Sequence, residues 1–394
     1  MLSGMLTFSI ALTATFLLTA PVRRLALQIG MMDQPNPRKL HQAPMPLLGG
    51  LAIYCGSVLA ILVSMDGQPR AQILGILAGA TLLLVTGILD DRGLLHHQVK
   101  LFIAMPLAAA TLLAVGIQFH FFSQFVAGAR GRIADLALTF FWVVGITSAL
   151  SILDHMDGLV SGVAAIASFF FVWLAIDSGQ VLVATLGAAV LGASLGFLRW
   201  NFKPAKIFMG DGGAMFLGFM LASLGLKLRV AETPETTALM IPILILAVPI
   251  FDTTLVSISR SRRGLLFFAA PGKDHTAHRL AKFHLGQRGA VLVIYGFGIL
   301  FGTLALLLSK YPLRRPFAFE ISLGLLTLAA VAVCECLPYE RQGHGSRVIR
   351  LAGNCARSYQ PMRQQGSEKI ISLSTALYGT KRHTGRGKSC RSRS

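Results

Sequence analysis

Carboxylates beside long apolar runs are the residues of this sequence whose types and spacing point first to chemistry. Asp90 and Asp91 end one apolar run, and Asp211 lies within Gly210–Gly213 where another begins. A carboxylate at the edge of a membrane helix is costly unless a cation compensates it, and glycines beside it let a large anionic ligand approach. Mg²⁺ is typically held by one or two carboxylates plus substrate phosphates. The segment predicts such a site, or else a glycine-rich turn with a solvated aspartate.

Other polar residues bear on that choice. Lys100 opens the apolar run that follows Asp90 and Asp91, which favours a functional pair over a solvated helix end. Asp154 and Asp157 are three residues apart, so they share a face if the helix before them continues. Helix capping by Asp157 explains one of these acids but not both. The second pair therefore predicts a cation or sugar hydroxyls as its partner.

A compact cationic cluster follows the first apolar run. Arg38, Lys39 and His41 stand between prolines that restrict the backbone. Such a cluster either receives a phosphate or anchors a loop on the positively charged side of a membrane.

A pair of histidines marks a later loop. His275 and His278 are three apart and are flanked by Lys273 and Arg279. Their spacing permits a metal site, but the neighbouring cations favour an anion to which the imidazoles donate. The loop spans about thirty residues between apolar runs, and a connection of that length is itself typical of function.

Long apolar runs must position these residues. The chain has 394 residues, of which 54% are hydrophobic and 13% charged, and runs of about 18–20 apolar residues are long enough to cross a bilayer. We expect an all-α polytopic membrane helix bundle of about eleven transmembrane helices. The expected spans are 1–20, 47–65, 71–89, 99–117, 133–153, 158–176, 180–198, 213–229, 238–258, 289–309 and 317–337.

Basic residues orient the bundle. They are more frequent in the odd-numbered connections than in the even-numbered ones, so the positive-inside rule places the amino terminus outside and the odd connections in the cytoplasm. The acids, glycines and histidines described above fall in the same connections, which predicts an active site at the cytoplasmic face. The net charge of +19 then needs no nucleic-acid partner.

Two domains are expected. Residues 1–337 form the transmembrane domain, and 338–394 form a basic tail that is typical of a disordered or membrane-surface segment. The five cysteines show neither metal-ligand spacing with histidines nor the density of a secreted disulfide framework, so we expect free thiols. A homodimer is compatible with this organisation.

Taken together, the polar loops resemble the polyprenyl-phosphate N-acetylhexosamine-1-phosphate transferases of glycosyltransferase family 4. The resemblance covers roughly residues 20–310 and is closest to the undecaprenyl-phosphate N-acetylglucosamine-1-phosphate transferase branch. The matching motifs are Asp90-Asp91 with Lys100, Asp154 to Leu159, Asn201-x-x-Pro-Ala, Phe208-Met-Gly-Asp211-x-Gly and Asp274-His275-x-x-His278-Arg-Leu. The sequence departs from the family's pattern at Ser148, Ser151, His155, Ala214 and Ala277.

The resemblance implies a reaction in the bacterial inner (cytoplasmic) membrane. N-acetylhexosamine 1-phosphate passes from a UDP-N-acetylhexosamine to undecaprenyl phosphate, and UMP is released. N-acetylglucosamine is the expected sugar. It implies Mg²⁺ or Mn²⁺ on Asp211, supported by Asp90 and Asp91. Phosphate charge is assigned to Lys100, His275, His278, Arg38, Lys39, His41 and Arg279, and nucleotide or sugar binding to Asp154, Asp157, Asn201 and Phe208. The alternatives are a catalytically impaired scaffold of the same family and a secondary transporter, which would need polar groups at mid-membrane and an internal repeat.

Overall fold

The computed structural model describes residues 2–35, 43–95, 97–230, 235–264, 274–311 and 316–336, all of which belong to one unit, Met1–Gln342. The predicted cationic residues Arg38, Lys39 and His41 and the predicted tail 338–394 lie outside the described residues.

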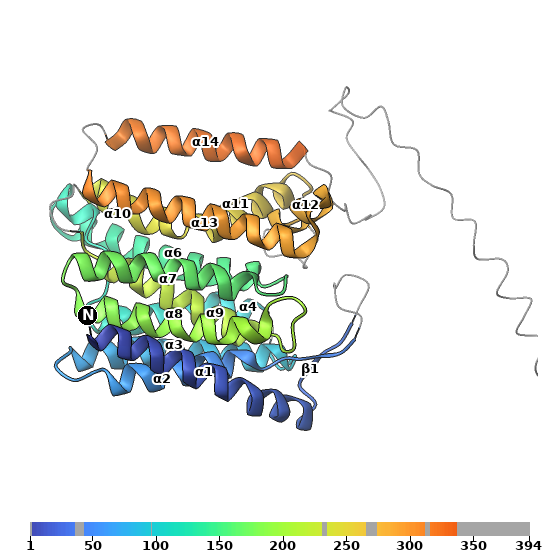
Figure 1. Cartoon of the computed structure of the whole chain (residues 1–394). Helices are drawn as coiled ribbons and strands as arrows, with labels where there is room; N and C mark the ends of the chain where they lie inside the picture. The colour runs from blue at the N-terminus through green and yellow to red at the C-terminus, as the bar shows by residue number, and fades with distance from the viewer. Residues whose placement is uncertain are drawn as a thin grey trace, which may run out of the picture. The chain divides into compact units, whose positions relative to one another are not determined.

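Helices make up nearly all of the described structure (Figure 1). The first half contains α1 (Leu2–Gln28), α2 (Gly49–Val63), α3 (Arg70–Asp91), α4 (His97–Val99), η1 (Lys100–Ala104), α5 (Met105–Ala114), η2 (Phe122–Gln124), α6 (Ala129–Leu153), α7 (Leu159–Asp177) and α8 (Val181–Asn201). The second half contains α9 (Gly210–Lys227), α10 (Glu235–Ile245), α11 (Ala247–Ser261), α12 (Thr276–Leu280), η3 (Ala281–Leu285), α13 (Gly286–Lys310) and α14 (Pro316–Cys336).

Each of the expected apolar spans coincides with helical structure, so the all-α membrane class is confirmed. Six helices among the described residues are long and apolar enough to cross a membrane: α1, α3, α6, α7, α8 and α13. A seventh is added if α10 and α11, which are bent by 78° at their junction, count as one span. The total of eleven crossings stays a prediction.

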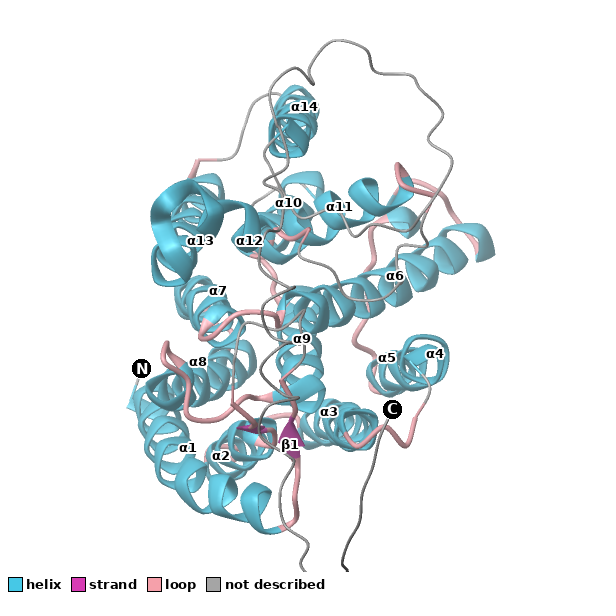
Figure 2. Cartoon of the chain, turned by 90° about the vertical axis from the view of Figure 1, so that its right-hand side faces the viewer, coloured by secondary structure: helices cyan, strands magenta, loops and turns pink. Residues whose placement is uncertain are grey.

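Helix α9 lies at the centre of the bundle and is packed against α2, α3, α6, α7 and α8 (Figure 2). Every residue from Gly212 to Leu226 is buried, as expected of a helix that is apolar all round. Glycines permit the close packing at its first turn. A Cβ on Gly87 of α3 would collide with the backbone of Gly212, and a Cβ on Gly50 of α2 would collide with that of Gly213. The start of α9 is thus held between α2 and α3.

A short hairpin fixes the chain that leads into α9. Strands β1 (Met32–Asp33) and β2 (Met45–Pro46) pair antiparallel, and Leu47 forms a parallel bridge with Phe208. The Gly50 N–H donates to the Met209 carbonyl at 2.8 Å. The first polar loop and the segment before Asp211 are therefore one hydrogen-bonded structure.

Candidate functional site

The ends of α3, η1 and α9 bring four predicted residues together. The Lys100 ammonium donates to Asp90 Oδ2 at 2.7 Å and also to Asp211 Oδ2. The Asp211 backbone N–H donates to Asp91 Oδ1 at 3.1 Å. The side chains of Asp90, Lys100 and Asp211 remain 17%, 19% and 24% exposed, so solutes can reach them. We call Asp90, Asp91, Lys100 and Asp211 the acidic centre.

Local backbone structure sets this geometry. Lys100 begins η1, a π-helical turn, a form that is frequent at functional sites. Gly210 has a φ of +73°, and a Cβ there would collide with the Asp91 carboxylate. Glycine therefore allows the turn that carries the Asp211 N–H to Asp91.

Ser151 and Asp154 extend the acidic centre from the end of α6. The Ser151 hydroxyl donates to Asp211 Oδ1 at 3.0 Å. Burial and the nearby carboxylates of Asp211, Asp91, Asp157 and Asp33 raise the pKa of Asp154 well above its usual range. Carboxylates grouped this closely favour a bound cation, since their mutual repulsion opposes ionisation.

The donor set fits a hard divalent cation. Carboxylate oxygens are the protein ligands that Mg²⁺ prefers, and Mg²⁺ uses few of them because it keeps water and phosphate oxygens. Asp211 is central, since it contacts Lys100, Ser151 and Asp91 through its side chain and backbone.

The structure gives Asp157 a different position, and both Asp157 and Asn201 different partners, from those predicted from the sequence. The chain leaves the helix after Leu153, so Asp154 and Asp157 do not lie on a helical continuation, and Asp157 Oδ2 accepts the Ala205 N–H at 3.2 Å. Asn201 is 4% exposed. Its amide oxygen accepts the Gly158 N–H and its amide nitrogen donates to the Ile207 carbonyl, both at 3.0 Å. In this structure both side chains tie the loops together, and their roles in substrate binding stay predictions.

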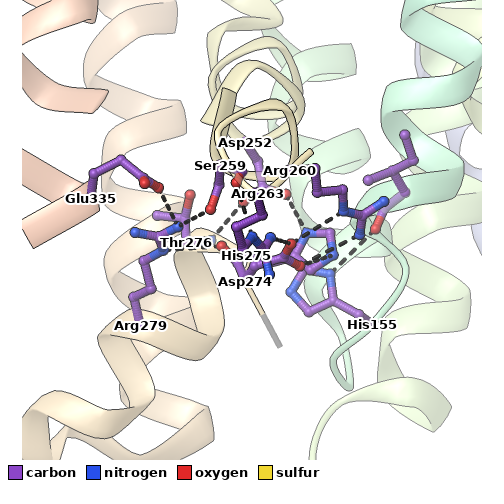
Figure 3. Close-up of polar contacts among 11 residues, drawn as sticks. His155, Asp252, Ser259, Arg260, Arg263, Asp274, His275, Thr276, Arg279 and Glu335 are labelled. Atoms are coloured by element: carbon purple, nitrogen blue, oxygen red, sulfur yellow. Dashed lines mark hydrogen bonds and ion pairs between the residues drawn. The ribbon is translucent and has the colours of Figure 1, made fainter. Parts of the chain in front are cut away.

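A second group of residues surrounds His275 (Figure 3). His275 Nδ1 lies 2.8 Å from Asp252 Oδ2, and the Thr276 N–H donates to Asp252 Oδ1 at 2.7 Å. The His155 ring stacks on His275 with 4.0 Å between ring centroids and lies 4.7 Å from that of His278. Burial and the neighbouring imidazoles lower the pKa of His155 well below its usual range. Both motif histidines are thus placed beside the residue that follows Asp154.

Arginines also contact this group. Asp274 accepts from Arg260 at 3.2 Å and from Arg263 at 2.6 Å. Burial opposes ionisation of Asp274, but these two arginines hold its pKa below the usual range. Arg279 is 1% exposed and donates to Glu335 at 2.8 Å and to the carbonyl oxygens of Asp274 and Cys334. Its predicted contact with substrate stays a prediction.

Several residues of the site were not singled out as site residues by sequence reasoning: Asp33, Ser151, His155, Asp252 and Glu335. Asp252 and Glu335 carried a usable signal, because an ionisable residue inside an apolar run is by default a functional candidate. The partly buried Phe208 was predicted to stack on uracil, and its backbone N–H donates to the Pro46 carbonyl at 2.9 Å. The stacking stays a prediction.

Comparison with known proteins gives a consistent picture. Residues 73–229 match glycosyl transferase family 4. The chain is 39% identical to a probable undecaprenyl-phosphate N-acetylglucosaminyl 1-phosphate transferase of Bacillus subtilis, over 77% of this chain and 84% of that protein. It is 33% identical to a decaprenyl-phosphate N-acetylglucosaminephosphotransferase of Mycobacterium tuberculosis, over 71% and 76%. It is 28% identical to an undecaprenyl-phosphate alpha-N-acetylglucosaminyl 1-phosphate transferase of Escherichia coli, over 74% and 81%.

Proposed function

This chain belongs to glycosyl transferase family 4, and from that membership we propose that it transfers N-acetylglucosamine 1-phosphate from UDP-N-acetylglucosamine to a polyprenyl phosphate. Its relatives are named for this transfer to undecaprenyl or decaprenyl phosphate. The observation that carries the proposal is the acidic centre, in which Lys100 bridges Asp90 and Asp211 at the ends of apolar helices. The product would start a cell-envelope polysaccharide.

The reaction is a displacement at phosphorus. An oxygen of the lipid phosphate forms a bond to the phosphorus that carries the sugar. The bond from that phosphorus to the oxygen bridging the two phosphates breaks, and UMP leaves with the bonding electrons. The product is a polyprenyl-diphospho-N-acetylglucosamine. Such phosphoryl transfer depends on positioning and charge neutralisation more than on covalent participation by the protein.

The acidic centre supplies that positioning. Mg²⁺ or Mn²⁺ held by Asp211, with support from Asp90 and Asp91, would neutralise phosphate charge as a Lewis acid. Lys100 adds a fixed positive charge to the same place. Ser151 and Asp91 fix the side chain and the backbone of Asp211, respectively.

The histidines are proposed to bind phosphate oxygens. Asp252 holds the His275 ring, and we assign His275 and His278 to donate to phosphate oxygens. The remaining predicted contacts to phosphate, nucleotide and sugar are retained in this proposal for Arg38, Lys39, His41, Asp154, Asp157, Asn201, Phe208 and Arg279.

The protein is a multi-pass membrane protein, and we place it in the bacterial inner membrane with the acidic centre facing the cytoplasm. The excess of basic residues in the connections that carry the motifs supports this orientation. The intact group of Asp90, Asp91, Lys100 and Asp211 favours catalysis over the scaffold alternative. A homodimer stays a prediction.

Release of UMP tests the proposal. Purified protein is given undecaprenyl phosphate, Mg²⁺ and UDP-N-acetylglucosamine, and UMP is measured by chromatography. We expect release that requires both the lipid and the metal and that falls by roughly 10²-fold or more in Asp211→Asn, the size expected for loss of a key electrostatic group. Release with another UDP-N-acetylhexosamine alone would change the donor but keep the reaction. Absence of release with every such donor would contradict catalysis.

A further inference from the structure

We propose that His155, Asp252 and His275 form a second metal site, which binds a divalent transition-metal ion such as Zn²⁺ and is distinct from the acidic centre. Each of the three residues offers one ligand atom, and these atoms all lie within 4.8 Å of one another. They come from three separate elements: the turn after α6, helix α11 and the residue before α12. The fold therefore assembles this group, which no local spacing in the sequence produces.

The unpaired nitrogen of His155 points to an ion. His155 Nε2 is buried and has no hydrogen-bond partner, and its Nδ1 lies 3.4 Å from the Ile152 carbonyl. Burying a polar atom without a partner costs free energy, so native proteins rarely leave one without a role. A bound metal ion would satisfy this nitrogen, because neutral imidazole is a common metal ligand.

Asp252 and His275 already lie close together in a buried position. Each is 3% exposed, and His275 Nδ1 lies 2.8 Å from Asp252 Oδ2, so an ion bound by both atoms would replace the hydrogen bond between them. Coordination through Nδ1 leaves the Nε2–H of His275 to donate to phosphate, the role assigned to it above. The other carboxylate oxygen of Asp252, Oδ1, accepts the Thr276 N–H. The carboxylate is therefore already fixed in place, and the three side chains need little rearrangement to bind an ion.

Ligand chemistry separates this site from the acidic centre. Two imidazoles and a carboxylate suit zinc and similar ions, which bind nitrogen at about 2.0–2.1 Å, whereas oxygen ligands alone suit Mg²⁺. The nearby Arg260 and Arg263 donate to Asp274, which offsets part of their repulsion toward a cation. With three protein ligands, a tetrahedral ion keeps a fourth position for water.

Metal content under competition tests the proposal. Full-length protein purified in detergent is equilibrated with Zn²⁺ in excess Mg²⁺, freed of unbound metal and analysed by inductively coupled plasma mass spectrometry. We expect the wild type and Asp211→Asn to retain equal zinc. We expect His155→Gln to bind zinc at least roughly 10²-fold more weakly, since loss of a ligand costs no less than loss of a residue that only supports one. The matched control is His120→Gln, since His120 is an exposed histidine of another loop, and it should behave as the wild type.

Further measurements keep these outcomes distinct. His155→Gly serves as a second variant, with thermal unfolding of each protein recorded to confirm that it is folded. Substitution by Co²⁺ gives a visible absorption spectrum that reports nitrogen ligation, and this spectrum should be lost with His155. Equal zinc in the wild type and both His155 variants, zinc lost only in Asp211→Asn, or a wild type without zinc would each overturn the second site.

Discussion

Asp91 acts on Asp211 through the backbone. Its Oδ1 accepts the Asp211 N–H at 3.1 Å, and the positive φ of Gly210 brings that N–H within reach. Lys100 meanwhile forms ion pairs with the side chains of Asp90 and Asp211. At the scale of single residues, the two adjacent aspartates therefore have different partners, and this bears on whether one of them serves as a general base.

We predict that Asp91→Asn lowers the transfer rate at every pH, by roughly 10²-fold. A phosphate monoester has a second pKa of about 6, so the attacking lipid phosphate is already ionised at neutral pH and needs no base. The measurement is the pH profile of kcat for the wild type and the variant. Asp177→Asn, at the exposed end of α7, is the matched control. A rate that recovers as the pH is raised would instead support a base role for Asp91.

At the scale of elements, glycine contacts and one buried ion pair hold the helices that carry the site. Gly87 and Gly212 let α3 approach α9 so closely that a Cβ on either would meet the other helix. Arg279 and Glu335 connect the segment that follows the histidines to α14. The first contact fixes the separation of α3, which bears Asp90 and Asp91, from α9, which bears Asp211, and the second holds α12, which bears His278, against α14.

Substitution of Gly87 tests the first of these contacts. We predict that Gly87→Ala lowers the free energy of unfolding by about 1–3 kcal/mol through overpacking. It should also lower activity, because the added methyl group pushes α3, and with it Asp90 and Asp91, away from Asp211. Thermal unfolding and UMP release measure the two effects. Gly145→Ala in α6, where a Cβ meets nothing within 4 Å, should be neutral or slightly stabilising. Equal behaviour of the two variants would contradict the close packing.

Loss of Glu335 tests the ion pair. Arg279 is 1% exposed, so Glu335→Gln leaves a buried guanidinium without its carboxylate, a change that typically costs about 3–5 kcal/mol. We predict a lower unfolding temperature than for Asp66→Asn, which removes an exposed carboxylate. The double variant Arg279→Leu with Glu335→Leu should recover much of the loss, because two apolar residues leave no unpaired charge. A Glu335→Gln protein as stable as the wild type would rule out a structural role for the pair.

At the scale of the whole molecule, the alternating directions of the helices bring the motif residues together at one end of the bundle. Asp91, Ser151 and Asn201 lie at or near the carboxyl ends of α3, α6 and α8, while Leu159 and Asp211 lie at or near the amino ends of α7 and α9. Successive helices joined by short connections run in opposite directions, so these ends meet on one side of the bundle. A single membrane orientation then exposes the whole site to one compartment.

Cysteine accessibility tests that orientation. In a protein whose native cysteines are replaced by serine, we predict that a membrane-impermeant maleimide labels Asp66→Cys in intact cells. It should label Arg92→Cys only after the membrane is permeabilised, because Arg92 follows Asp91 on the predicted cytoplasmic side. Both positions are exposed, so they serve as controls for each other. The reverse pattern would contradict the positive-inside assignment.

Apolar length and residue type were enough to predict which segments are helices and to name candidate residues for the chemistry, because both are local properties that need no knowledge of packing. Only the tertiary structure decided the partners: Lys100 with Asp211, His275 with Asp252, and Arg279 with Glu335. Such pairs join segments far apart in the chain, and their distances depend on how closely neighbouring helices pack. The break between α10 and α11 and the stacking of His155 on His275 likewise followed from packing, so no periodicity in the sequence predicted them.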